Sequence, residues 1–208
     1  MSDVKRQYDG AARRARAERM SDALIETARD TLLGEGYSAL TIPKLARACG
    51  VSAESVYKRF PGKTALVRAV VEQALRGIGP VAAEVRSDAV DAHDLDRLLQ
   101  AWGRLSAEVG PRVAPILLLL DAAAVHDPEL AALGRELEET RRARMTDNAR
   151  RLADAGHLPP GLPVSRATDI LLTYSSPQLY DLLVLRSGWD AGQYGDFIST
   201  GIAAHLAR

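Results

Sequence analysis

The sequence predicts an all-α protein of about nine helices, with a three-helix helix-turn-helix domain near its start and a larger helical domain after it. Alanine and leucine are abundant and β-branched residues are scarce, which favours helices over sheets. Apolar residues recur at helical spacing in segments that glycine and proline separate. No stretch of useful length alternates apolar and polar residues as a half-buried strand does.

Basic residues gather near the start of the chain. Residues 1–68 hold 13 of the 27 Lys and Arg residues and 8 of the 27 Asp and Glu residues, so this part carries +5 and the rest −5. Such asymmetry indicates a basic end that binds a polyanion, either nucleic acid or an anionic membrane surface. Residues 1–19 form a basic arm in which Gly10 is expected to interrupt any helix. A solvated, partly disordered arm and an arm lying on DNA phosphates both fit this composition.

Four helices are expected in the part of the chain that follows the arm. The first begins at Ser21, buries an apolar face and ends at Gly34. Thr41 caps the second, which stops at Gly50, and Ser52 caps the third. A proline-glycine pair ends the third helix, and the fourth follows directly.

The second and third helices form a helix-turn-helix unit if they pack on the first. Both are too short to be stable alone. Gly50 permits a tight turn between them, Ala46 allows a close crossing, and Val51 and Val56 fill the space. In such a unit the N-terminal part of the later helix enters the DNA major groove. The spacing therefore indicates DNA binding, although two short packed helices without that role fit it equally well.

The stretch from Gly36 to Val67, GYSALTIPKLARACGVSAESVYKRFPGKTALV, resembles the DNA-binding domain of TetR-family transcriptional regulators. That family's pattern is an apolar helix, then G-[YF]-x-x-[TA]-[TS]-[IV]-x-x-[IL]-A, then A-G-V-S-x-x-x-[LIV]-Y-x-[HY]-F and a turn ending in K-x-x-L. With the first helix, the resemblance covers about 50 of the 208 residues. Cys49, Glu54, Arg59 and Gly62 replace residues that are more common in the family.

The resemblance implies a set of residues that contact a double-stranded DNA operator. They are Thr41, Ala53, Glu54, Ser55, Tyr57, Lys58, Arg59 and Lys63. Those at 53–55 would face base edges, and the others would contact the backbone. Glu54 could accept a hydrogen bond from a cytosine amino group or only favour the helix N-terminus. Tyr57 could contact DNA or pack in the core.

Residues 69–208 are expected to form a second domain, after the first at 20–68. Gly77, Gly79 and Pro80 mark a change of character between them. The helices expected here span about 91–109, 112–125, 128–155, 165–186 and 191–207, with a proline-rich loop at 156–163. Pro177 is expected to kink the helix that contains it.

The resemblance implies that this second domain binds a small-molecule effector and forms the homodimer. The last two helices, about 165–207, would pair with those of a second copy in a four-helix bundle. An effector cavity needs apolar walls and a few polar groups. The candidates are Trp102, Leu105, Leu117, Leu120, Asp121, Met145, Tyr174 and Gln178, and plain core packing fits each of them too.

The remaining features argue against other classes of protein. Neither a catalytic motif nor a metal-binding spacing of the four histidines and the single Cys49 is found, so no enzyme, metal or cofactor is expected. No apolar run approaches the roughly 18 residues of a membrane span. With no signal peptide recognised, a cytoplasmic protein is expected. The resemblance to TetR-family regulators therefore implies a ligand-responsive repressor; a ligand-independent DNA-binding regulator or an activator is the alternative.

Overall fold

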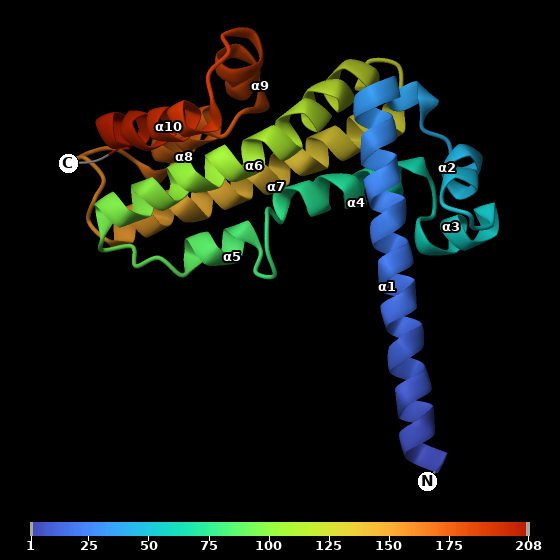
Figure 1. The fold of residues 1–208 in the computed structure, drawn as a ribbon. Coiled ribbons are helices and arrows are strands. Elements are labelled where there is room, and N and C mark those ends of the chain that lie inside the picture. Colours follow the sequence, from blue (N-terminus) through green and yellow to red (C-terminus); the bar gives the residue numbers. More distant parts are fainter. Residues whose placement is uncertain (1, 207–208) are drawn as a thin grey trace. The chain divides into compact units, whose positions relative to one another are not determined.

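The all-α prediction is confirmed in the computed structural model, which describes the backbone of residues 2–206 and the side chains of residues 15–206. Within that range the chain has α-helices and no strand (Figure 1). The helices are α1 (Ser2–Glu35), α2 (Ile42–Ala48), α3 (Ala53–Arg59), α4 (Lys63–Leu75), α5 (Ala83–Asp88), α6 (Leu95–Ala124), α7 (Pro128–Asp154), α8 (Val164–Tyr174), α9 (Pro177–Tyr180) and α10 (Ala191–Leu206). They belong to two compact units, one up to Val70 and one from Val71 onward.

The first unit is the expected helix-turn-helix. Its caps are as predicted: the Thr41 hydroxyl accepts from the Lys44 backbone N–H at 3.3 Å, and the Ser52 hydroxyl accepts from that of Ser55 at 3.1 Å. Gly50 provides the turn with a φ of +65°, a value that residues with a Cβ rarely adopt. The core between α1, α2 and α3 contains Leu24, Ala28, Leu32, Leu45, Ala46 and Val56.

The expected break at Gly10 is wrong, because α1 is continuous from Ser2 to Glu35. A glycine inside a helix costs about 1 kcal/mol relative to alanine, which lowers helix stability without ending the helix. The basic side chains at positions 5, 6, 13 and 14 lie outside the described side chains. Arg16 and Arg19 are described and exposed.

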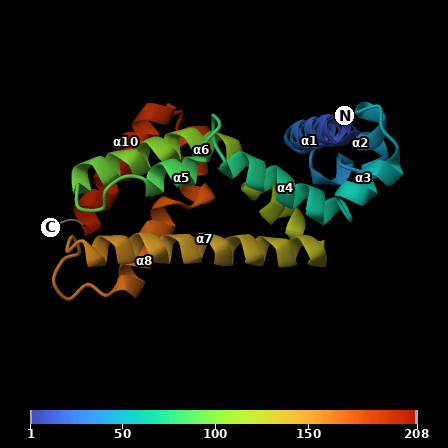
Figure 2. The same cartoon turned by 90° about the horizontal axis from the view of Figure 1, so that it is seen from below.

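The second unit is built around α6 and α7. α10 lies along α6, and α8 lies along α7 (Figures 1 and 2). Their shared core contains Leu98, Trp102, Ala149, Leu152, Leu171, Tyr180, Ile198 and Ile202. The short α5, in a part of the chain where no helix was expected, packs on α6.

The two helices expected at 91–109 and 112–125 are one helix, α6, with Pro111 and Pro115 inside it. An interior proline removes a backbone donor and costs about 3 kcal/mol. The adjoining residues Val113, Ala114 and Ile116 are buried, and their packing offsets this cost. Burial in the tertiary structure, which local sequence rules do not include, therefore keeps α6 continuous.

The helix expected at 165–186 is divided, so the expected kink at Pro177 is wrong. α8 ends at Tyr174, Ser176 caps the next helix with its hydroxyl, and Pro177 is the first residue of α9. The residue before a proline is disfavoured in helical conformation, and Ser176 is extended at φ −75° and ψ 139°. α9 continues directly into a π-helical segment, Asp181–Arg186.

Candidate functional site

The surface of α3 carries most of the residues expected to contact DNA. Val56 is buried and Phe60, which follows α3, is 6% exposed, so these two anchor the helix to the core. The intervening Tyr57, Lys58 and Arg59 are exposed. Tyr57 is 52% exposed, so its ring is not part of the core.

Two of the predicted basic contacts also hold the first unit together. The Arg59 Nε donates to the Ser21 hydroxyl on α1 at 3.1 Å. The Lys63 ammonium donates to the Tyr37 carbonyl at 2.5 Å and lies 3.5 Å from the centre of the Tyr37 ring. Lys58 has no partner among the side chains of residues 15–206. It is therefore the basic group of α3 with the most freedom to reach a ligand.

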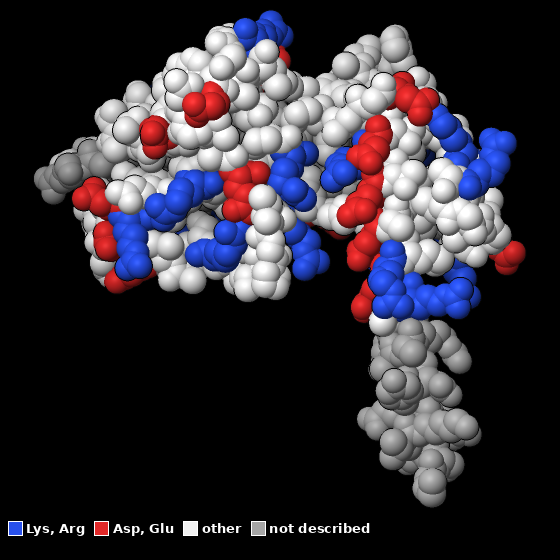
Figure 3. All heavy atoms as spheres, viewed as in Figure 1, with Lys and Arg blue, Asp and Glu red and all other residues white. Residues whose placement is uncertain are grey.

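Basic side chains lie on the surface formed by α2 and α3, and acidic ones follow α1 (Figure 3). The acids of α1 include Glu18, Asp22, Glu26 and Asp30, all exposed and spaced four residues apart. Glu54 is the one acidic residue of α3. Its exposed carboxylate makes no hydrogen bond or ion pair with the described side chains, so both of its expected roles remain predictions.

A cavity in the second unit lies between α6, α7 and α9. Its volume is about 320 Å³. Four of the residues proposed from the sequence line it, namely Leu117, Leu120, Asp121 and Gln178. Five further lining residues were not proposed: Gly134, Leu137, Glu138, Arg141 and Pro177. Those on α7 follow the i, i+3, i+4, i+7 pattern that places residues on one helix face. A helix face with two charged residues is, however, more typical of a solvated surface.

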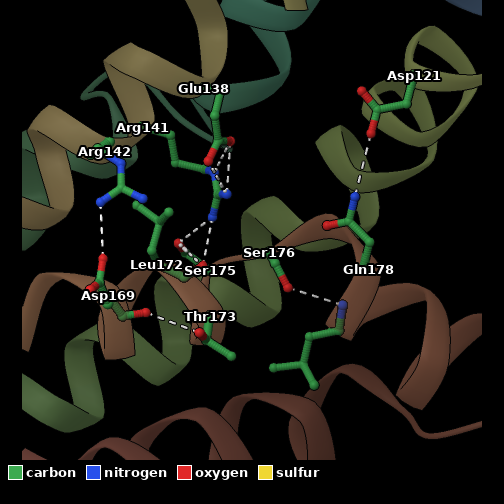
Figure 4. Close-up of polar contacts among 11 residues, drawn as sticks. Asp121, Glu138, Arg141, Arg142, Asp169, Leu172, Thr173, Ser175, Ser176 and Gln178 are labelled. Atoms are coloured by element: carbon green, nitrogen blue, oxygen red, sulfur yellow. Dashed lines mark hydrogen bonds and ion pairs between the residues drawn. The ribbon is translucent and has the colours of Figure 1, made fainter. Parts of the chain in front are cut away.

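The polar groups of the cavity are joined in two sets (Figure 4). Arg141 donates to both carboxylate oxygens of Glu138 at 2.8–3.0 Å. Its Nη1 also donates to the Leu172 carbonyl at 2.7 Å and the Ser175 hydroxyl at 2.9 Å, which ties α7 to the end of α8. Separately, the Gln178 amide donates to an Asp121 carboxylate oxygen at 3.4 Å.

The other four proposed cavity residues lie elsewhere. Trp102 is 4% exposed in the core, and Met145 packs against that core. Leu105 is partly buried on α6. The Tyr174 hydroxyl contacts the His205 Nδ1 at 3.0 Å, and burial raises the pKa of this tyrosine above its ordinary value of 10. None of them lines the described cavity, so a ligand contact for them stays a prediction.

In the segments expected to form the dimer interface, some apolar residues are buried in the core and others are exposed. Ile198, Ile202 and Leu206 of α10 are buried inside the chain's own core. In the π-helical segment, Leu182 is 55% exposed and Leu185 is 51% exposed. Apolar surface thus remains available there.

Neither a metal site nor a membrane span is found in the part of the chain that the structure describes. No group of three or more His, Cys, Asp or Glu residues there is arranged to hold a metal ion. None of the helices there is both long and apolar enough to cross a membrane.

Comparison with known proteins identifies the first unit. Residues 24–70 match the family model described as bacterial regulatory proteins, tetR family. No curated protein matches the chain.

Solved structures resemble nearly the whole chain. A TetR-family regulator from Rhodococcus sp. has a TM-score of 0.66 at 16% identity, covering 91% of this chain and all of the other. The SmeT–triclosan complex has a TM-score of 0.71 at 16% identity, covering 91% and 92%. A regulator from Saccharomonospora viridis in complex with choline has a TM-score of 0.64 at 15% identity, covering 92% and 99%. At these identities the likeness shows the fold.

Proposed function

We propose that this chain, a DNA-binding transcriptional regulator of the TetR family, is a repressor that binds a palindromic operator as a dimer and is released by a small-molecule effector. The observation that carries the proposal is the α3 surface. Val56 and Phe60 fix the helix to the core, while Tyr57 and Lys58 stay exposed. A regulator of this kind acts in the cytoplasm, where promoter DNA lies.

The roles proposed for the site residues follow from their positions. Ala53, Glu54 and Ser55 occupy the start of α3, which is the part of a recognition helix that faces base edges. Tyr57, Lys58 and Arg59 occupy its end and would contact sugars and phosphates, as would Thr41 and Lys63. Phosphate contacts fix the register of the protein on the duplex, and base contacts specify the sequence.

A dimer is proposed because one α3 is too short to read a long site. Helix-turn-helix proteins bind two half-sites one helical turn apart, with a two-fold axis relating both protein and DNA. The exposed Leu182 and Leu185 support an interface at residues 165–207, because apolar surface of this kind is favourably buried against a second copy.

An effector is proposed because the second unit contains the cavity between α6, α7 and α9. Its volume of about 320 Å³ suits a small organic molecule. Two of the structurally similar proteins hold such molecules, triclosan and choline. An effector that binds the non-DNA-binding conformation more tightly would shift the population away from the operator.

Footprinting of the purified chain on genomic fragments tests the proposal. We expect protection of a palindrome upstream of its own or a neighbouring gene, because adjacent recognition helices require two-fold related half-sites. The neighbouring genes would then indicate the effector class. Equal binding to promoter and random DNA would contradict the DNA-binding role. Operator affinity that no metabolite of those genes alters would instead favour a ligand-independent regulator.

A further inference from the structure

Three ionisable side chains line the cavity between α6, α7 and α9, and their charges are not balanced. Glu138 and Asp121 are acidic, and Arg141 is basic. The pairing of the arginine decides what the cavity can bind. A free guanidinium would attract an anion, whereas a neutralised one leaves an excess of negative charge.

Arg141 is fully engaged by the protein. Its Nε and Nη2 form a two-pronged contact with the Glu138 carboxylate, and the pair is therefore close to neutral. Its Nη1 donates to the Leu172 carbonyl and the Ser175 hydroxyl. The Arg141 side chain is 21% exposed and the Glu138 side chain is 51% exposed, so the ion pair is open to water on the glutamate side. Arg141 thus fastens α7 to α8 and has little capacity left for a bound anion.

Asp121 has no cationic partner among the described side chains. Its one hydrogen bond is with the neutral amide of Gln178, at the long distance of 3.4 Å. Asp121 also lies in the last turn of α6, where the partial negative charge of the helix end adds to its own. The start of α9, which also lines the cavity, is already capped by the Ser176 hydroxyl.

The rest of the cavity wall is largely apolar. Leu117 and Leu120 of α6, Leu137 of α7 and Pro177 of α9 contribute hydrocarbon surface. An occupant that fits this wall has an apolar body. An occupant that fits Asp121 carries one positive charge, and Gln178 retains an amide oxygen that can accept a hydrogen bond from it.

We infer that the cavity takes a compact organic cation, with its amine or quaternary ammonium group against Asp121 and its apolar body between the leucines. The inference rests on the proposed function for its regulatory meaning, since the cation would be the effector. Binding of the cation itself does not depend on the proposed function, because it is a property of the cavity.

Titration calorimetry on the full chain tests the inference with three probes that share one aromatic ring. Benzylamine is a cation at neutral pH, benzyl alcohol is its neutral counterpart and benzoate is an anion. We expect benzylamine to bind about tenfold more tightly than benzyl alcohol, as one screened ion pair at a partly exposed site provides. In Asp121→Asn, which keeps the side-chain shape, this preference should vanish.

Asp169→Asn is the matched control, because Asp169 makes an ion pair with Arg142 on α7 and does not line the cavity. It should keep the preference for benzylamine. Equal binding of the amine and the alcohol, tighter binding of benzoate, no measurable binding of benzylamine, or an unchanged preference in Asp121→Asn would each overturn the inference.

Operator binding in the presence of benzylamine, measured separately, distinguishes the two proposals. A chain that binds the amine through Asp121 but keeps its operator supports the inference and contradicts effector release. A chain whose operator is released by a neutral or anionic molecule, with no preference for benzylamine, supports the proposed function and overturns the inference.

Discussion

At the scale of the residue, hydrogen bonds from two neighbouring segments change the acidity of Glu108. Its carboxylate accepts from Arg86 Nη2 at 2.5 Å and from the Ile78 backbone N–H at 2.6 Å. The hydrogen bond from Arg86 lowers the pKa of Glu108 below its ordinary value of 4.5, against the opposing effect of burial. Glu108 thereby ties α6 to the loop after α4 and to α5.

This lowered pKa predicts how stability depends on pH. The contribution of Glu108 is fully present above the carboxyl's ordinary pKa of 4.5 and is lost as the pH falls through its lower folded-state value. Glu108→Gln should lower the free energy of unfolding by about 1 kcal/mol at neutral pH. In this variant the free energy of unfolding should also fall less steeply as the pH is lowered. Urea unfolding at several pH values measures both effects. Glu139→Gln, at an exposed position on α7, is the control. An equal change in the free energy of unfolding of both variants would contradict the stabilising role of Glu108.

Single residues also show how far the cavity could be predicted. Leu117, Leu120, Asp121 and Gln178 were proposed because an effector cavity needs apolar walls and a few polar groups. Arg141 and Glu138 were missed because a charged pair on α7 has the pattern of a solvated face. Only their contacts with each other and with α8 place them in the cavity wall.

At the scale of the element, the packing of α10 on α6 depends on two glycines. A Cβ at Gly195 would lie 2.8 Å from the Gly103 carbonyl oxygen and 3.1 Å from the Ala107 Cβ. A Cβ at Gly103 would lie 2.5 Å from the Gly195 carbonyl oxygen. The two helices therefore approach closely enough to exclude any side chain at these positions.

Gly195→Ala should force α10 away from α6 and lower the free energy of unfolding by about 1–3 kcal/mol, the usual cost of overpacking. The clash is with backbone and not with a flexible side chain, so it cannot be relieved by a rotamer change. Gly134→Ala on α7 is the control, because nothing lies within 4 Å of its added Cβ. That variant should be neutral or more stable, by up to about 1 kcal/mol of helix propensity. Equal melting temperatures for both variants would be inconsistent with the close packing.

Helix locations were easier to predict than helix limits. Caps such as Thr41 and Ser52 act through hydrogen bonds to residues three positions away, so local sequence reveals them. Prolines are ambiguous, because their effect depends on packing that local sequence does not contain. Pro111 and Pro115 lie inside one helix, whereas Pro177 begins a new one.

At the scale of the whole molecule, α4 spans the boundary between the two units. Residues of α6 form hydrogen bonds with the C-terminal end of α4 and with the loop that follows it. Arg112 Nε donates to the Ala74 carbonyl at 3.4 Å, and Glu108, one turn earlier on α6, accepts from the Ile78 N–H. The same helix carries Leu117, Leu120 and Asp121 into the cavity. We propose that an effector alters operator affinity through α6 and α4. A shift of α6 would move the end of α4 with it, because α6 residues form hydrogen bonds there.

The central claim is that two copies of α3 lie on one operator. Its most direct test is the salt dependence of operator affinity, measured by fluorescence anisotropy for wild type, Lys58→Ala and Arg29→Ala. Arg29 is the matched control, because it lies on α1 and pairs with Asp30. If each Lys58 neutralises one phosphate, Lys58→Ala should weaken binding and reduce the slope of log K against log salt by about 2 for a dimer. Arg29→Ala should leave the slope unchanged. A slope that Lys58→Ala does not alter, or that Arg29→Ala alters equally, would contradict the placement of α3 on DNA.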